Sequence, residues 1–305
     1  MIRFIPDLSK IKLNVVSTLN EQHNWGLSFV NTEEAWLYSQ GENVKVAVID
    51  TGWQPHKDLQ PNFHSGYDAT GGNDFIDHGN YHGLHVAGII AADCGDGVGV
   101  KGVAPKSKLI PIKALDNEGN GSYEFIEKAL QIVLDLDVDI VNMSLGSSFS
   151  PSGTQVHSLI QKIAEQGKII VCASGNDGLE VNYPAKYDEV IAVAATQNDG
   201  SLAKFSSRGP ELDLAAPGVK IYSTWGDNAY INLDGTSMAA PCISGMIALI
   251  ISWYKQNPDP NFKIHYINMI KLMYELGESN IIHSENCKIG VPKLHNFNPW
   301  KNTHA

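Results

Sequence analysis

The chain has little positive charge and few cysteines for its length. Among its 305 residues only 22 are Lys or Arg against 33 Asp or Glu, so the formal net charge is −11. A nucleic-acid partner is not expected, because binding to phosphates depends on Lys and Arg displacing counterions. The four cysteines are scattered and no two form a C-x-x-C pair. This usage indicates reduced thiols in a cytoplasm and argues against a disulfide scaffold.

Long apolar runs are also missing. No run reaches the roughly 18 residues that a helix needs to cross a bilayer, and the segment from Met1 to Asn14 lacks the apolar core of a secretory signal. We therefore expect no membrane partner and a cytoplasmic location for the chain as written.

Apolar runs and helical patterns alternate from Val44 onward. With 43% hydrophobic residues the chain can bury a large core within one domain. The alternation predicts an α/β fold with a mostly parallel central sheet flanked by helices. Runs at 46–49, 140–143 and 169–173 are apolar throughout, as strands covered on both faces must be. A site is expected at the carboxyl ends of these strands.

Three short motifs carry Asp, His and Ser in that order. VIDTG ends a strand at Asp50, HGLHVAG opens a helix at His82, and GTSMAAP carries Ser237. A serine hydroxyl is a poor nucleophile at neutral pH, so it needs an imidazole as base and a carboxylate to orient that imidazole. Alone, each residue also fits a strand-end turn, a core histidine or a helix N-cap. Their conjunction favours the triad of a serine protease.

These motifs resemble those of subtilisin-type serine proteases, the subtilase family, and of the intracellular subtilisins in particular. The resemblance extends over residues 21–253 and implies a three-layer fold and an endopeptidase that works through an acyl-enzyme intermediate. It assigns catalysis to His82 and leaves His85 as a packing residue. Leu84, where the family usually has Thr or Ser, and Cys242, where His is common, depart from the pattern without removing a proton-transfer group.

The resemblance also implies the residues that contact a peptide substrate. Asn176 matches the side-chain amide that stabilises the oxyanion, although its local sequence equally fits a loop Asn in a turn. The substrate is expected to lie as an extended strand between two segments of the chain, with main-chain hydrogen bonds supplying affinity. The expected substrate-binding residues are Ser144, Leu145, Gly146, Asn120, Gly121, Ser122, Ser174, Gly175 and Asn182.

Calcium is the cofactor that the resemblance implies, held by the glycine-rich loop 94–100. Calcium prefers several oxygen ligands, and a glycine-rich turn without an ion is the alternative. The expected ligands are Asp58 and Asp96 with the carbonyls of Cys94, Val98 and Val100. A second, weaker site for a monovalent ion would use Glu211 and Asp213 with the carbonyls of Ala185, Tyr187 and Val190. Catalytic zinc is not expected, because no H-E-x-x-H pattern is present.

The N-terminal FIP, Phe4 to Pro6, is similar to the short inhibitory extension of intracellular subtilisins. A proline near the scissile position lacks an amide donor and shifts the bound strand out of register. Residues 1–20 are therefore predicted to form a self-inhibitory arm, with 21–277 as the catalytic domain and 278–305 as a C-terminal tail. An edge strand or a disordered leader is the alternative for the arm, and a homodimer stays open.

Peptides or proteins are the expected substrates. Two other functions stay open: a dedicated peptidase that matures a leader peptide or a phage protein, and a protease-like module that binds peptides without cutting. The complete triad and Asn176 argue against the module. An esterase of the α/β-hydrolase kind is disfavoured, because GTSMA is not a G-x-S-x-G elbow.

Overall fold

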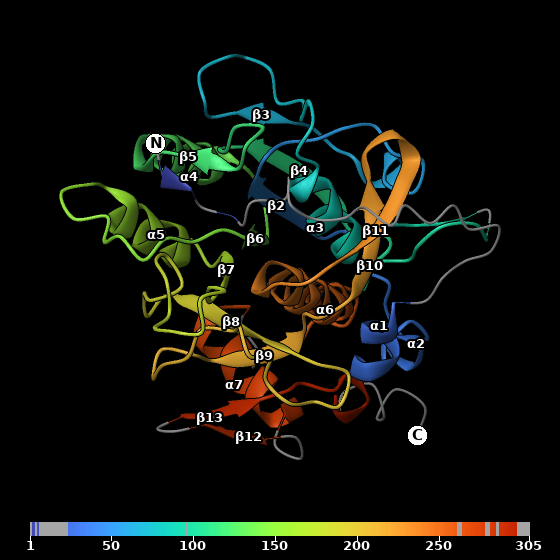
Figure 1. The fold of residues 1–305 in the computed structure, drawn as a ribbon. Coiled ribbons are helices and arrows are strands. Elements are labelled where there is room, and N and C mark those ends of the chain that lie inside the picture. Colours follow the sequence, from blue (N-terminus) through green and yellow to red (C-terminus); the bar gives the residue numbers. More distant parts are fainter. Residues whose placement is uncertain are drawn as a thin grey trace.

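The computed structural model describes residues 2–3, 5, 24–95, 97–260, 264–277, 281–284 and 287–297. Within them, a sheet of nine strands lies at the centre of the fold with helices packed around it (Figure 1). The strand order is β12-β13-β9-β8-β7-β6-β2-β4-β3, and every neighbouring pair except β12 and β13 is parallel. The predicted α/β class with a mostly parallel sheet is confirmed.

The strands of this sheet are short and mostly buried. They are β2 (Lys45–Asp50), β3 (Tyr67–Asp68), β4 (Lys108–Lys113), β6 (Ile140–Met143), β7 (Ile169–Ala173), β8 (Val190–Thr196), β9 (Leu214–Pro217), β12 (Ile281–Ser284) and β13 (Cys287–Gly290). Two antiparallel pairs lie outside it: β1 (Ile2–Arg3) with β5 (Asn120–Gly121), and β10 (Ile221–Trp225) with β11 (Ala229–Leu233).

Helices cover the sheet on both sides. The α-helices are α1 (Trp25–Val30), α2 (Thr32–Ala35), α3 (His82–Ala91), α4 (Tyr123–Asp135), α5 (Val156–Glu165), α6 (Thr236–Gln256) and α7 (Tyr266–Gly277), and short 3-10 turns span Gln60–Asn62, Gly226–Asn228 and Leu294–Asn296. Successive side chains of a strand point to opposite faces. In β2, Val46 and Val48 therefore pack in the core with α3 and α6, whereas Ala47 and Ile49 pack in the core with α4 and α5.

Helix α6 is the central helix of the protein. It is 21 residues long and, by length and composition alone, could cross a membrane, but 94% of its apolar stretch is buried inside the protein. The expectation that no apolar stretch is this long is wrong, since small residues and serines dilute the run without breaking its helical packing. The helix begins at Thr236, directly before Ser237, and is buried from there to Trp253.

Two features of the fold carry no strong signal in the sequence. The hairpin β10–β11 packs on α3: Ser223 Oγ donates to the His85 carbonyl at 2.8 Å and Thr224 Oγ1 to the Leu84 carbonyl at 2.7 Å. At the other end of the sheet, part of the segment expected as a tail supplies β12 and β13, and β13 pairs with β9 through Gly290 and Leu214.

Candidate active site

Asp50 and His82 meet where β2 ends and α3 begins. The Nδ1–H of His82 donates to Oδ1 of Asp50 at 2.8 Å, and the same oxygen accepts the backbone N–H of Thr51 at 2.8 Å. Both side chains are buried, with Asp50 0% and His82 1% exposed. A hydrogen bond between a carboxylate and an imidazole is strong in such a water-poor setting. It fixes the orientation of the imidazole ring.

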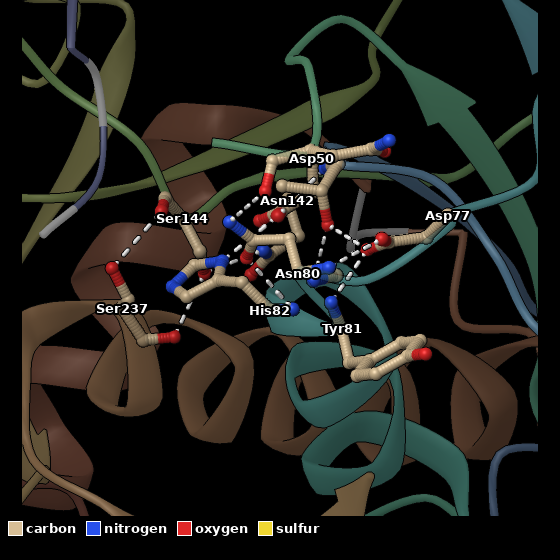
Figure 2. Close-up of polar contacts among 11 residues, drawn as sticks. Asp50, Asp77, Asn80, Tyr81, His82, Asn142, Ser144 and Ser237 are labelled. Carbon is tan, nitrogen blue, oxygen red and sulfur yellow. Dashed lines mark hydrogen bonds and ion pairs between the residues drawn. The ribbon is translucent and has the colours of Figure 1, made fainter. Parts of the chain in front are cut away.

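The second ring nitrogen of His82 is available for chemistry. Because the carboxylate of Asp50 accepts a hydrogen bond from Nδ1–H, the neutral imidazole has its lone pair on Nε2. Among the residues that the structure describes, this buried Nε2 has no hydrogen-bond partner. Figure 2 shows the imidazole between the carboxylate of Asp50 and the side chain of Ser237. A buried, unpaired acceptor beside a hydroxyl is the arrangement that a general base requires.

Ser237 lies at the beginning of α6 and is bound on two sides by Ser144. Its Oγ–H donates to the carbonyl of Ser144 at 2.9 Å, and Oγ of Ser144 donates to the carbonyl of Ser237 at 2.9 Å (Figure 2). The hydroxyl of Ser237 therefore donates to a carbonyl in this structure and not to His82. Catalytic hydrogen bonds often tighten only once substrate is bound.

The second of these bonds explains how α6 tolerates a proline. Pro241 lies in the second turn, where a helical N–H would donate to the carbonyl of Ser237 four residues earlier. Proline has no N–H, so that carbonyl would lack a donor. The hydroxyl of Ser144 supplies one.

Asn176 presents its amide nitrogen toward the same place. Its Oδ1 accepts two hydrogen bonds from Thr236, from the backbone N–H at 2.8 Å and from Oγ1 at 2.9 Å. With the oxygen occupied, Nδ2 faces the other way, and it lies 3.5 Å from where a Cβ on Gly235 would be. Since Thr236 and Gly235 directly precede Ser237, the donor lies beside the backbone of the expected nucleophile.

The segments expected on one side of the substrate pocket are in contact. Ser144, Leu145 and Gly146 follow β6, while Ser174 and Gly175 follow β7. The backbone N–H of Asn182 donates to the carbonyl of Ser174 at 2.8 Å. A Cβ on Gly175, whose φ is +118°, would lie 2.6 Å from Nδ2 of Asn182, so only glycine fits there.

The other expected substrate segment is already paired with a strand. Asn120 and Gly121 form β5, and Ser122 caps α4 by accepting the N–H of Phe125 at 3.2 Å. Strand β1 runs antiparallel along β5, with Ile2 opposite Gly121 and Arg3 opposite Asn120. The edge assigned to substrate is therefore covered by the chain's own N-terminal residues.

The loop expected to hold calcium closes around one buried carboxylate. Asp58 is 2% exposed, and its Oδ2 accepts the N–H of Val100 and the hydroxyl of Tyr230, both at 2.9 Å. A Cβ on Gly99 would lie 2.1 Å from that oxygen, so the loop wraps tightly around it. The carbonyls of Cys94 and Val98 belong to the same loop, whereas Asp96 lies outside the described residues.

A cationic side chain also reaches this loop. Nζ of Lys57 donates to the carbonyl of Val98 at 3.3 Å. Oxygen donors around a buried carboxylate fit calcium in their chemistry, but the ammonium of Lys57 and the ion would compete for one of them. Among the described residues, no three His, Cys, Asp or Glu side chains form a metal-binding group.

The two carboxylates of the weaker ion site have different protein partners. Asp213 Oδ2 accepts the N–H of Ala192 at 2.9 Å, and burial raises the pKa of this carboxyl to about 6. Glu211 lies 3.9 Å from the ammonium of Lys186, and the carbonyl of Tyr187 accepts the N–H of Val190 at 3.1 Å. The weaker ion site, with these residues and Ala185, stays a prediction.

Sequence reasoning missed several polar residues around the expected triad. Asp77 is fully buried beside Thr51, and Asn142 links Ser144 to Ser244 through hydrogen bonds of 2.9 Å on either side. Asp77 carried one usable signal, since an Asp a few residues before a helix start often binds the following backbone amides. Asn142 lies inside an apolar strand, where its role depends on neighbours far away in the sequence.

Known proteins are similar to this chain over most of its length. The model of the subtilase family matches residues 41–281. The chain is 39% identical over 257 residues to the thermostable alkaline protease of Halalkalibacterium halodurans, covering 82% of this chain and 68% of the relative. It is 39% identical to the major intracellular serine protease of Bacillus subtilis, and the match covers 84% of this chain and 82% of the relative. It is 43% identical to subtilisin DY of Bacillus licheniformis, and that match covers 70% of this chain and 79% of the relative.

The chain therefore belongs to the subtilase family. It is a subtilisin-type serine endopeptidase, a hydrolase that acts on peptide bonds.

The packing histidine beside the site makes stability sensitive to acid. His85 is completely buried with Nε2 3.2 Å from the Ile231 carbonyl, and burial lowers its pKa from 6.5 to about 3. The unfolded chain therefore binds a proton between these pH values while the folded one does not. The free energy of unfolding must fall as the pH drops from 6.5 toward 3.

We predict that His85→Gln reduces this loss, because glutamine keeps a donor for Ile231 but gains no proton. In a Ser237→Ala background, urea unfolding at neutral pH and at about pH 4 should show a smaller drop for the Gln variant than for the parent. If the free energy of unfolding falls equally in both proteins between the two pH values, the buried His85 is not the cause of the loss.

Proposed function

We propose that the protein cleaves peptide bonds with Ser237 as nucleophile, His82 as general base and acid, and Asp50 as the carboxylate that orients His82. One observation carries this proposal: His82 is held by Asp50 at 2.8 Å while its buried Nε2 is left unpaired beside Ser237. Rotation about the Cα–Cβ bond of Ser237 moves its hydroxyl from the carbonyl of Ser144 toward that nitrogen. The hydroxyl proton then passes to Nε2 as oxygen attacks the substrate carbonyl.

The remaining steps use the same groups. The tetrahedral oxyanion accepts hydrogen bonds from Nδ2 of Asn176 and from the backbone N–H of Ser237. Protonated His82 gives its proton to the leaving amine, and the acyl-enzyme remains on Ser237. Water then attacks with Nε2 as base and releases the acid product. Asp50 stabilises the imidazolium in both halves of the reaction without taking its proton.

The substrate lies between the edges Ser144 to Gly146 and Asn120 to Ser122. These two segments supply backbone donors and acceptors to an extended peptide. Because backbone groups are common to all peptides, the enzyme should accept a broad range of substrate sequences. Asn182 and Gly175, in contact with each other, form part of the wall of the pocket for the residue before the cleaved bond.

Replacing the proposed nucleophile and oxyanion donor tests the chemistry. Ser237→Ala should abolish casein hydrolysis and labelling by a fluorophosphonate, because the attacking oxygen is gone. Asn176→Ala should lower kcat by about 10²–10³-fold with little change in KM, the loss known for subtilisin when one oxyanion donor is removed. The exposed Asn198→Ala is the matched control. Peptide binding without labelling in a chain that lacks residues 1–20 would instead identify a non-cutting module.

We further propose that residues 1–20 inhibit the enzyme by occupying the substrate edge. The support is the antiparallel pairing of Ile2 with Gly121 and of Arg3 with Asn120, together with the burial of Ile5, which is 3% exposed against Gly119. A bound peptide would need the same backbone groups of β5. Phe4 and Pro6, which suggested the arm, lie outside the described residues.

Removing the arm or loosening it should raise activity. Deletion of residues 1–20 should lower KM for a chromogenic peptide, and Ile5→Ser in the full chain should do so in part, because it removes the buried contact with Gly119. The exposed Leu37→Ser, which alters a 78% exposed apolar residue, is the control. Equal kinetics of the intact and truncated chains would remove the idea.

We propose that calcium binds the loop 94–100, with Asp58 and the carbonyls of Cys94, Val98 and Val100 as ligands and Asp96 as the second carboxylate. The ion would supply structural stability and no step of the reaction. Its buried carboxylate and glycine-rich wrapping support this assignment. Binding displaces the ammonium of Lys57 from Val98, so this lysine weakens the site.

Lys57→Gln should therefore bind calcium more tightly than the parent. In the Ser237→Ala background, adding calcium to chelated protein raises the melting temperature through binding to the folded state, and the Gln variant should reach half of that rise at a lower calcium concentration. Lys271→Gln, an exposed lysine on α7, is the matched control. If calcium does not change the melting temperature of any of the three proteins, the loop 94–100 does not bind calcium.

An intracellular location is supported by the similarity to the major intracellular serine protease of Bacillus subtilis and by three buried cysteine thiols among the described residues. The relatives also include an extracellular protease of the same organism. Fractionation of cells that express the full chain, followed by fluorophosphonate labelling, distinguishes the two locations.

A further inference from the structure

A second buried carboxylate lies next to the Asp50–His82 pair. Asp77 is 0% exposed, and four donors reach it: the backbone N–H groups of Gly79 at 3.0 Å, Asn80 at 2.8 Å and Tyr81 at 2.7 Å, and the hydroxyl of Thr51 at 2.6 Å. Burying a carboxylate is costly unless its oxygens are satisfied. Here every contact donates into it, as an ionised carboxylate requires.

The fourth donor connects this carboxylate to the expected catalytic pair. Oγ1 of Thr51 donates to Asp77 and accepts the backbone N–H of Gly83 at 3.0 Å, while the N–H of Thr51 donates to Asp50. Thr51 directly follows Asp50, and Gly83 directly follows His82. Figure 2 shows Asp77 and Tyr81 on the side of this cluster away from Ser237. The end of β2 and the first turn of α3 are thus tied together by one hydroxyl.

The start of α3 has an unusual backbone that the same carboxylate stabilises. Tyr81 precedes the helix in a left-handed conformation, with φ 62° and ψ 11°, and its own side chain makes no cap hydrogen bond. Such a conformation is rare and unfavourable for a residue other than glycine, and it persists only where its surroundings hold it. The bond from the Tyr81 N–H to Asp77 supplies that support. The turn sets the direction in which His82 leaves the backbone.

The first turn of α3 is packed too closely against the end of β2 to adopt another orientation without displacing it. A Cβ on Gly83 would lie 2.9 Å from the carbonyl of Gly52 and 3.1 Å from Cβ of Asp50, so α3 and the end of β2 are already in close contact. Any rotation of the first turn of α3 therefore changes the angle between the imidazole of His82 and the carboxylate of Asp50. Catalytic groups misplaced by about 1 Å can lose about 100-fold in rate.

We propose that Asp77, acting through Thr51 and Tyr81, is a positioning residue for the catalytic histidine: it holds the first turn of α3 so that His82 faces both Asp50 and Ser237. This inference rests on the proposed function and deepens it. Asp77 touches no reacting atom. Its effect is on the fraction of molecules in which the base is correctly aimed, and therefore on kcat more than on KM.

The decisive variant is Thr51→Val in a chain without residues 1–20 and, in parallel, in the full chain. It removes the hydroxyl link but keeps the shape of the side chain, and it leaves the three backbone donors on Asp77. We expect kcat to fall about 10–100-fold with KM within about twofold. The rate at which a fluorophosphonate labels Ser237 should fall by the same factor, and Thr51→Ser should restore both.

Asp77→Asn is the second variant, because its amide faces the N–H of Tyr81 with a donor instead of an acceptor. It should reduce kcat and labelling in the same way. Combining it with Thr51→Val should cost less than the product of the two separate losses, since both changes break the hydrogen bond between Thr51 and Asp77. Asp74→Asn makes the same change of charge at an exposed carboxylate of the same loop and is the matched control. It should leave kcat within about twofold of the parent.

The outcomes separate this inference from the proposed function. A parent chain without residues 1–20 that neither cuts casein nor reacts with fluorophosphonate refutes the proposed function. An active parent whose Thr51→Val and Asp77→Asn variants melt earlier but keep kcat and labelling rate refutes the positioning role, and leaves Asp77 as part of a structural turn. If Thr51→Val fails to fold, Asp77→Asn and the rescue by Thr51→Ser decide the matter by the same two readouts.

Discussion

The hydrogen bond between Asp50 and His82 is the interaction on which the site depends. It is buried, it joins the end of a central strand to the start of a helix, and it decides which nitrogen of the imidazole carries the lone pair. The parallel sheet makes this possible by bringing β2, β6 and β7 to end at one edge. Ser144, which binds Ser237, and Asn176 lie in the loops that follow β6 and β7.

Much of this arrangement was predictable from the sequence because its signals are local. The apolar runs at Ile140–Met143 and Ile169–Ala173 coincide with β6 and β7, since a strand covered on both faces must be apolar throughout. The Asp, His and Ser motifs were informative because each combines a reactive residue with glycines that allow close approach, as at Gly83. The family model matching 41–281 agrees with that interpretation.

What the sequence did not reveal depends on contacts between distant segments. The hairpin β10–β11 is held on α3 by the hydroxyls of Ser223 and Thr224, which donate to carbonyls of that helix. The presence of Ser or Thr in a strand does not indicate which distant carbonyl its hydroxyl will bind. Helix α6 tolerates Pro241 because the hydroxyl of Ser144 donates to the carbonyl of Ser237. These two residues are 93 positions apart in the sequence. The role of Asp77 depends on backbone amides, which every sequence has.

The pairing of β1 with β5 has a thermodynamic consequence. Ile2 and Gly121 belong to one chain, so their association has an effective concentration set by the intervening polypeptide and not by the amount of protein. Diluting the protein therefore does not change the fraction of molecules in which β1 covers β5. Only a competing peptide, a cut in the connecting segment or a weaker strand contact can shift that balance, and each acts on individual molecules independently of their neighbours.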